Sequence, residues 1–148
     1  MSKFVLTVAA AALSLTATLA HASRDDAEVL HKAALAEARA KGVEGAGKEF
    51  SNGGAWAKGS TYVFIADFKA TVLAHSVNPK IIGKNLWDVK DADGKLFVQD
   101  QVRIVQSAGN GTVQMRWMNP ATKQIGDAEV LLARIPGAEA YIGTVYFK

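Results

Sequence analysis

Apolar positions recur at two different spacings along this chain, and the two spacings predict helices in some segments and strands in others. Residues 24–41 carry apolar side chains three or four positions apart, with Asp25 and Asp26 in the first turn, where the helix dipole favours anions. Gly42 follows as a helix stop signal. We therefore predict one helix over 24–41 and a second over 95–107, where apolar residues again recur at helical spacing.

The segment between these two helices starts with a glycine-rich connector and continues with alternating residues. Residues 42–59 predict the connector, with a short helix over 46–50 inside it. The period then changes to two, so 61–67 and 71–75 predict the two strands of a hairpin. Residues 86–89 predict one further turn of helix.

Three more strands are predicted after the second helix, over 112–118, 124–135 and 140–147. The order of elements is then helix, two strands, helix, three strands. Connections between successive strands are too short for a crossover, which requires a dozen or more residues. We therefore predict an α+β fold with an antiparallel sheet of about five strands.

The first 22 residues have the composition of a secretory leader. Lys3 precedes an apolar stretch, and Ala20-His21-Ala22 gives a small-x-small cleavage pattern. The alternative is an uncleaved anchor, but this stretch contains Ser and Thr and is short for a bilayer span of about 20 apolar residues. We predict a signal peptide over 1–22, one domain over 23–148, and a periplasmic or secreted mature chain with no membrane span.

Composition restricts the class of protein further. The chain has 148 residues, of which 49% are apolar, so one domain with a packed core is expected. It has no Cys, so this core must form without disulfides. The 17 basic and 14 acidic residues are scattered, with no run of Lys or Arg, whereas nucleic-acid binders usually cluster basic residues. We expect no nucleic-acid partner.

A turn sequence, Asp91-Ala92-Asp93-Gly94, invites comparison with a calcium-binding loop. Such a loop requires an oxygen ligand at its fifth position and a Glu at its twelfth. Counted from Asp91, these positions are Lys95 and Val102, and neither is a ligand. The sequence therefore predicts a tight turn before a helix and no metal site.

Catalysis has little support in the sequence. After the leader only His31 and His75 remain as histidines, and without Cys they are too few for a transition-metal site. The chain contains no Gly-x-Ser-x-Gly nucleophile elbow. We predict that the protein is not an enzyme and uses no cofactor.

His75 is the most informative titratable residue, and two interpretations stay open. It could be a strand-end histidine hydrogen-bonded to nearby backbone, or it could lie at the mouth of a pocket and donate to an anion.

Tyr62 and Trp117 also carry polar tips that need partners when buried, which suits a small cavity in an apolar wall. Tyr62 and Phe64 share one face by period two. Trp117 shares a face with Met115 in the same way.

The order of residues over 62–98, together with a shorter segment over 116–120, resembles the single Cache domain family of extracytoplasmic sensor domains. The resemblance rests on a collinear series of positions: Tyr62, Phe64, Asp67, His75, Asn78, Pro79, Gly83, Asn85, Asp91, Gly94, Trp117, Asn119, Pro120, Arg134 and Gly143. It implies a PAS-like antiparallel sheet with a long N-terminal helix on one face and a ligand pocket on the other. Relatives of this kind bind short carboxylates such as acetate, propionate, pyruvate or lactate.

Two departures from the family pattern bear on the ligand. Many relatives carry a Lys and a Tyr on the strand that precedes the Pro-Gly turn, whereas residues 127–131 here read Asp-Ala-Glu-Val-Leu. The last strand is also one residue short of the usual Gly-x-Gly-x-Tyr ending. The pocket could therefore bind something less anionic, or no ligand at all.

From the resemblance we expect a free-standing, exported, non-enzymatic domain that binds a small organic acid or similar metabolite. It would report binding to a separate membrane receptor or transporter. The predicted ligand-binding residues are Tyr62, His75, Trp117, Asn119, Trp56 and Phe64. The alternative is a ligand-free interaction protein that forms a homodimer through the alanine-rich face of its first helix, at Val29, Ala33, Ala36 and Ala40.

Overall fold

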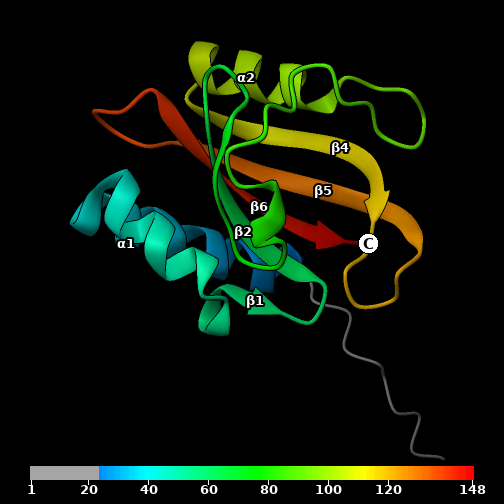
Figure 1. Cartoon of the computed structure of the whole chain (residues 1–148), viewed down its shortest axis with the longest axis horizontal. Helices are drawn as coiled ribbons and strands as arrows, with labels where there is room; N and C mark the ends of the chain where they lie inside the picture. Colours follow the sequence, from blue (N-terminus) through cyan, green and yellow to red (C-terminus); the bar gives the residue numbers. More distant parts are fainter. Residues whose placement is uncertain (1–23) are drawn as a thin grey trace, which may run out of the picture.

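The computed structural model describes residues 24–148 and shows one antiparallel sheet with a helix on each face (Figure 1). The predicted leader therefore lies outside the described residues. The elements are α1 (Arg24–Ser51), η1 (Gly54–Trp56), β1 (Ala57–Lys58), β2 (Thr61–Asp67), β3 (Val72–His75), η2 (Pro79–Ile81), α2 (Phe97–Ser107), β4 (Asn110–Met118), β5 (Ile125–Arg134) and β6 (Ala140–Phe147). The α+β class and the antiparallel pairing predicted from the sequence are confirmed.

The sheet runs in the order β1-β2-β6-β5-β4, and β3 also pairs with β2. The last strand therefore lies between β2 and β5, so the first and last strands of the predicted sheet meet at its centre. In the β2–β6 ladder Phe64 stands opposite Gly143. The sequence predicted about five strands, and the sixth is the two-residue β1, which is too short to show a period.

Helix α1 extends beyond its predicted end. Gly42 has φ 73° and ψ 176°, which breaks the helix at the residue expected to stop it. Helical structure then resumes and continues to Ser51, further than the short helix predicted over 46–50. Ala46 and Phe50 are fully buried against the sheet, so packing supports this second segment.

One core lies between α1 and the sheet. It contains Leu30, Ala34, Ala38, Ala46, Phe50, Val63, Ile65, Ala74, Ile135, Ala140 and Ile142. The alanines let the helix approach the strands closely. His31 adds a polar tie, since its Nδ1 lies 2.8 Å from the Thr144 hydroxyl on β6.

A second core lies on the opposite face, beneath α2 and the loop that follows β3. Its members include Tyr62, Phe97, Val102, Val105, Met115, Val130, Leu132, Tyr141 and Val145. Helix α2 begins at Phe97, two residues later than predicted. Residues 86–89 form a turn closed by the Val89 N–H and the Leu86 carbonyl rather than the predicted turn of helix.

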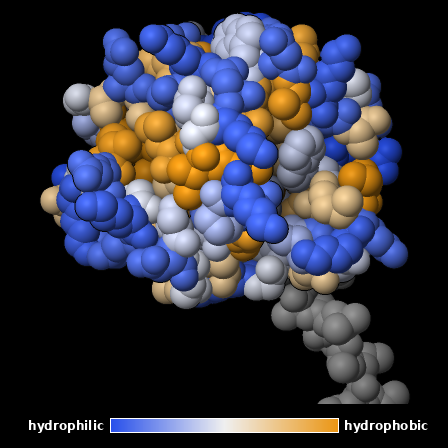
Figure 2. Space-filling view, in the orientation of Figure 1, coloured by the Kyte–Doolittle hydropathy of each residue, from blue (hydrophilic) through white to orange (hydrophobic). Residues whose placement is uncertain are grey.

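Within residues 24–148, neither α-helix has an apolar stretch long enough to cross a bilayer. Apolar residues do reach the surface, and Figure 2 shows them gathered across the middle of one face, between α1 and α2. The most exposed large apolar side chain is Val29, which is 71% exposed on α1.

Candidate functional site

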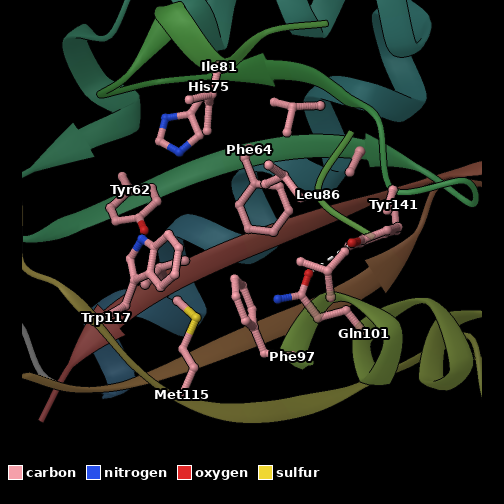
Figure 3. Close-up of a pocket in the computed structure, with 15 residues that line it drawn as sticks. Tyr62, Phe64, His75, Ile81, Leu86, Phe97, Gln101, Met115, Trp117 and Tyr141 are labelled. Carbon is pink, nitrogen blue, oxygen red and sulfur yellow. Dashed lines mark hydrogen bonds between the residues drawn. The ribbon is translucent and has the colours of Figure 1, made fainter. Parts of the chain in front are cut away.

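A small cavity lies inside the second core, between the sheet, α2 and the loop after β3 (Figure 3). Its volume is about 50 Å³. That exceeds the roughly 10–15 Å³ that one water molecule needs and is far below the roughly 300 Å³ of a pocket for a drug-sized ligand. The cavity, as it stands, is suited to a molecule of only a few heavy atoms.

Strand alternation brings four of the predicted site residues to this cavity. Tyr62 and Phe64 reach it from β2, Trp117 from β4, and His75 from the end of β3. Tyr62 and His75 have ring centroids 5.0 Å apart, and Phe64 and His75 6.3 Å apart. The prediction that Tyr62 and Phe64 lie on the same face of the strand is therefore confirmed. Whether these residues bind a ligand stays a prediction.

Phe64 can lie across the neighbouring strand because its partner in the ladder is a glycine. A Cβ at Gly143 would overlap the Phe64 ring. The ring instead rests over the bare backbone of β6 and meets Tyr141 edge-on, with centroids 6.0 Å apart. Gly143 thus fixes where the cavity's central wall stands.

His75 is hydrogen-bonded to nearby backbone, as the first interpretation expected, and it also lines the mouth of a cavity, while donation to an anion stays a prediction. Its Nδ1 accepts hydrogen bonds from the backbone N–H groups of Asn78 at 2.9 Å and Val77 at 3.3 Å. Burial lowers the pKa of His75 to about 4, so the ring is neutral at pH 7. Because Nδ1 accepts, the proton of the neutral ring sits on Nε2, which is then a donor on a side chain that lines the cavity.

Tyr62 and Trp117 supply two more uncharged donors. Tyr62 is 4% exposed, and burial raises the pKa of its hydroxyl, so the phenol stays protonated. In Figure 3 this hydroxyl and the indole nitrogen of Trp117 both lie on the same side of Phe64 as His75. The Trp117 ring is held by Phe97, with centroids 4.9 Å apart.

Two cavity residues that the sequence analysis missed are Gln101 and Tyr141. Gln101 is 1% exposed on α2, and its Oε1 accepts a 2.8 Å hydrogen bond from the fully buried Tyr141 hydroxyl. Figure 3 shows the other end of this amide, Nε2, turned toward the cavity. A signal was present in the sequence, because Gln101 stands four residues from both Phe97 and Val105 on the apolar face of the helix.

A wider groove of about 670 Å³ continues from the cavity toward solvent. The two spaces share Tyr62, His75, Ile81, Leu86 and Trp117, which therefore form the boundary between them. Two cationic residues, Lys80 and Lys123, line the outer groove. The 15 residues that line the cavity itself include no Asp, Glu, Lys or Arg. The cavity is thus uncharged and positive charge lies only outside its mouth.

The structure does not bring the other two predicted site residues, Trp56 and Asn119, to the cavity. Trp56 packs edge-on against Phe50 in the core beneath α1, with ring centroids 4.7 Å apart. The Asn119 Oδ1 accepts hydrogen bonds from the Ser60 hydroxyl and the Ala121 N–H, both at 2.9 Å. Asn119 therefore fastens the β4–β5 turn to the loop before β2.

Asp91, considered above as a calcium ligand, has its oxygens engaged by backbone. Oδ1 accepts from the N–H groups of Asp93 and Lys95, and Oδ2 from that of Arg116. Burial alone would raise the pKa of this carboxyl, but the three N–H donors outweigh it and the pKa is lowered. Residues 24–148 contain no cluster of three His, Asp or Glu side chains that could hold a metal ion.

Comparison with known families decides the relationship. The profile of the family described as Single Cache domain 2 matches residues 15–147, nearly the whole chain. This chain belongs to the single Cache domain family. None of the curated proteins searched matches its sequence. The family consists of extracytoplasmic sensor domains, in keeping with the resemblance seen in the sequence.

Solved structures with the same fold include other Cache sensor domains. A periplasmic sensor domain of a chemotaxis protein is 22% identical, with a TM-score of 0.64 over 83% of this chain and 88% of that one. A structure described as the basis for carboxylic acid recognition by a Cache chemosensory domain is also 22% identical, with a TM-score of 0.64 over 83% and 86%. A methyl-accepting chemotaxis protein from Vibrio parahaemolyticus RIMD 2210633 is 16% identical, with a TM-score of 0.62 over 81% and 79%.

Proposed function

We propose that this Cache domain binds a small organic acid in the cavity, outside the cytoplasm, and that it does so without catalysis. The observation that carries the proposal is that Tyr62, His75 and Trp117 place three uncharged hydrogen-bond donors at the mouth of an apolar, enclosed space. A carboxylate needs donors there, and the apolar walls suit a short carbon chain. One solved relative with this fold is described as recognising carboxylic acids, which supports the same class of ligand.

Recognition would rest on hydrogen bonds to the ionised carboxylate. A hydrogen bond to a charged group contributes roughly 1.5–3 kcal/mol, so two or three donors can offset the cost of removing the anion from water. Lys80 and Lys123 line the outer groove, where they would attract an anion toward the mouth. The inner cavity stays free of charge when no ligand is bound.

Export and signalling follow from the same proposal. Cleavage of the leader after Ala22 would release the domain into the periplasm or the medium, and a separate membrane receptor or transporter would then read its ligand-bound form. No cavity residue is arranged as a nucleophile with a general base, because His75 uses Nδ1 for backbone N–H groups and Nε2 is protonated. This supports a binding role rather than an enzymatic one.

The test is a thermal-shift screen of the purified protein against C2–C4 carboxylates, followed by titration calorimetry. A ligand at about a hundred times its Kd should stabilise the fold by roughly 2.7 kcal/mol. His75→Asn keeps an acceptor for the Val77 and Asn78 N–H groups and removes the donor at the mouth, so we expect affinity to fall about tenfold. His31→Asn is the matched control, since His31 lies on the other face of the sheet. Its affinity should stay as in the wild type.

No stabilisation by any acid would overturn the proposal. A fall in affinity of the same size in both histidine variants would also contradict it, because it would then reflect general loss of structure.

A second candidate function has one specific observation in its favour. Val29, Ala33, Ala36 and Ala40, which the sequence analysis assigned to a dimer contact, are all exposed along α1. A second copy of the chain could cover this strip. Light scattering of the wild type and of Val29→Asp tests it: a dimer that dissociates in the variant supports the contact, and a monomer at high concentration refutes it.

A further inference from the structure

The closed end of the cavity carries its own polar pair, separate from the donors at the mouth. Gln101 and Tyr141 line the cavity but not the outer groove, so they stand at its inner end. Phe64 forms the wall between the two ends of this one cavity, and its ring centroid is 6.3 Å from that of His75 and 6.0 Å from that of Tyr141. Figure 3 shows the same arrangement, with Tyr62, His75 and Trp117 on one side of Phe64 and Gln101 on the other.

The orientation of the Gln101 amide is fixed by its neighbour. The Tyr141 hydroxyl donates to Oε1 at 2.8 Å, which turns the two N–H groups of Nε2 toward the cavity. No group within residues 24–148 accepts a hydrogen bond from Nε2, although the side chain is 1% exposed. Nε2 is therefore open to the cavity rather than sealed in the core. A molecule that fills this end would cover it, and a covered donor without an acceptor is costly, so that molecule must offer one.

We propose that Gln101 determines which small acids the cavity accepts, by donating from Nε2 to an oxygen on the buried end of the ligand. The preferred class is then a small oxo or hydroxy acid rather than the alkyl acid of the same size. This inference rests on the proposed function, since it assumes that the carboxylate is held at the mouth by Tyr62, His75 and Trp117. An alkyl group at the inner end would exclude water from Nε2 and leave it unpaired.

Matched ligands test the preference directly. Isobutyrate, lactate and pyruvate have the same number of heavy atoms and differ in one substituent: methyl, hydroxyl or oxo. Isovalerate and acetoacetate form a second set with the oxygen one carbon further from the carboxylate. We expect calorimetry at pH 7 to show that the oxygen-bearing acid binds about tenfold more tightly than its alkyl counterpart in the set whose oxygen reaches Gln101.

Variants then assign the preference to Gln101. Gln101→Met keeps the length of the side chain and removes both donors, so the ratio of oxo-acid to alkyl-acid affinity should fall to about one. Gln106→Met is the matched control, because Gln106 is exposed on the same helix, and its ratio should equal that of the wild type. Tyr141→Phe releases the amide and should lower the ratio as well.

The outcomes separate this inference from the proposed function. If no acid binds the wild type, the proposed function fails. If acids bind but neither set shows a preference, or if Gln101→Met keeps the wild-type ratio, only the role of Gln101 is overturned. Should Gln101→Met fail to fold, the wild-type comparison and Tyr141→Phe still decide the question.

Discussion

Acid should destabilise this domain through His75, because the fold holds that imidazole neutral. Burial lowers the pKa of His75 from 6.5 to about 4. Between these two values the unfolded chain binds a proton at His75 and the folded chain does not. The free energy of unfolding is therefore highest above pH 6.5 and decreases as the pH falls toward 4. The cost is structural as well, since a proton on Nδ1 would displace the N–H groups of Val77 and Asn78.

The size of the effect follows from the two pKa values. Their difference corresponds to about 3 kcal/mol once the pH is well below 4, at about 1.4 kcal/mol for each pH unit. Between pH 7 and pH 4.5 about 2 kcal/mol of this is lost. A domain of this size has a total stability of roughly 5–15 kcal/mol, so the loss is a large share of it.

Urea unfolding followed by tryptophan fluorescence measures the loss. At a slope of about 1–3 kcal/mol per molar urea, the midpoint should fall by roughly 1–2 M between pH 7 and pH 4.5. His75→Asn lacks the titrating group and should lose about 2 kcal/mol less than the wild type over the same range. His31, whose pKa is also lowered, chiefly by burial, contributes in the same direction, and His31→Asn isolates its share.

Two results would refute this reasoning. An equal dependence on pH in the wild type and His75→Asn would show that His75 is not held neutral by the fold. A rise in stability as the pH falls would show that the folded protein binds the proton more tightly than the unfolded chain.

Two substitutions test other parts of the site. Gly143→Ala should push the Phe64 ring into the cavity, which should lower the free energy of unfolding by roughly 1–3 kcal/mol and weaken acid binding. The double variant Gly143→Ala with Phe64→Leu should regain stability. A Gly143→Ala variant as stable as the wild type would contradict the predicted clash. Asp91→Ala removes the acceptor of three backbone N–H groups and should cost roughly 2–3 kcal/mol by urea unfolding. Because the pKa of Asp91 is lowered, that cost should persist unchanged down to pH 4.5, and its disappearance at pH 5 would argue against this role.

The elements set by local patterns were predictable from the sequence. Strands β4, β5 and β6 occur within two residues of their predicted ends, because runs of eight to ten residues with strand-like composition between turn residues specify a strand. Alternation placed Tyr62 and Phe64 on one face, as observed. A short helix over 46–50 was predicted past Gly42, but its merging with α1 and its full length to Ser51 were not. The full length depends on burial of Phe50 against strands that are distant in the sequence.

The candidate site was predictable only in part, for a related reason. Tyr62, His75 and Trp117 lie on strands whose parity is visible in the sequence, and the fold brings them together. The pairing of Gln101 with Tyr141 joins residues 40 positions apart on a helix and a strand, and no local pattern links them. A polar residue on the apolar face of α2 was the available signal.

Several residues in the collinear series that identifies the family hold loops in place rather than lining the cavity. The Asp67 carboxylate accepts from the N–H groups of Lys69 and Thr71, both at 2.9 Å, and so closes the β2–β3 turn. The Asn85 amide donates to the Lys69 carbonyl at 2.7 Å, which ties the loop after β3 to that turn. Asp91 does the same for the segment before α2. One part of the shared series therefore holds the loops around the cavity, and another part, Tyr62, Phe64, His75 and Trp117, lines it.

Strand β5 carries one of the two departures from the family pattern. The stretch in which a Lys and a Tyr were expected presents Ala128 and Val130 to the core around the cavity. Glu129 points to the other face, where it pairs with Arg24 of α1 at 2.9 Å. A cation therefore does not enter the cavity from this strand. Burying an ammonium group without a ligand would be costly, whereas neutral donors are far less so. Under the proposed function, recognition by uncharged donors would leave no unpaired charge in the cavity when no acid is bound.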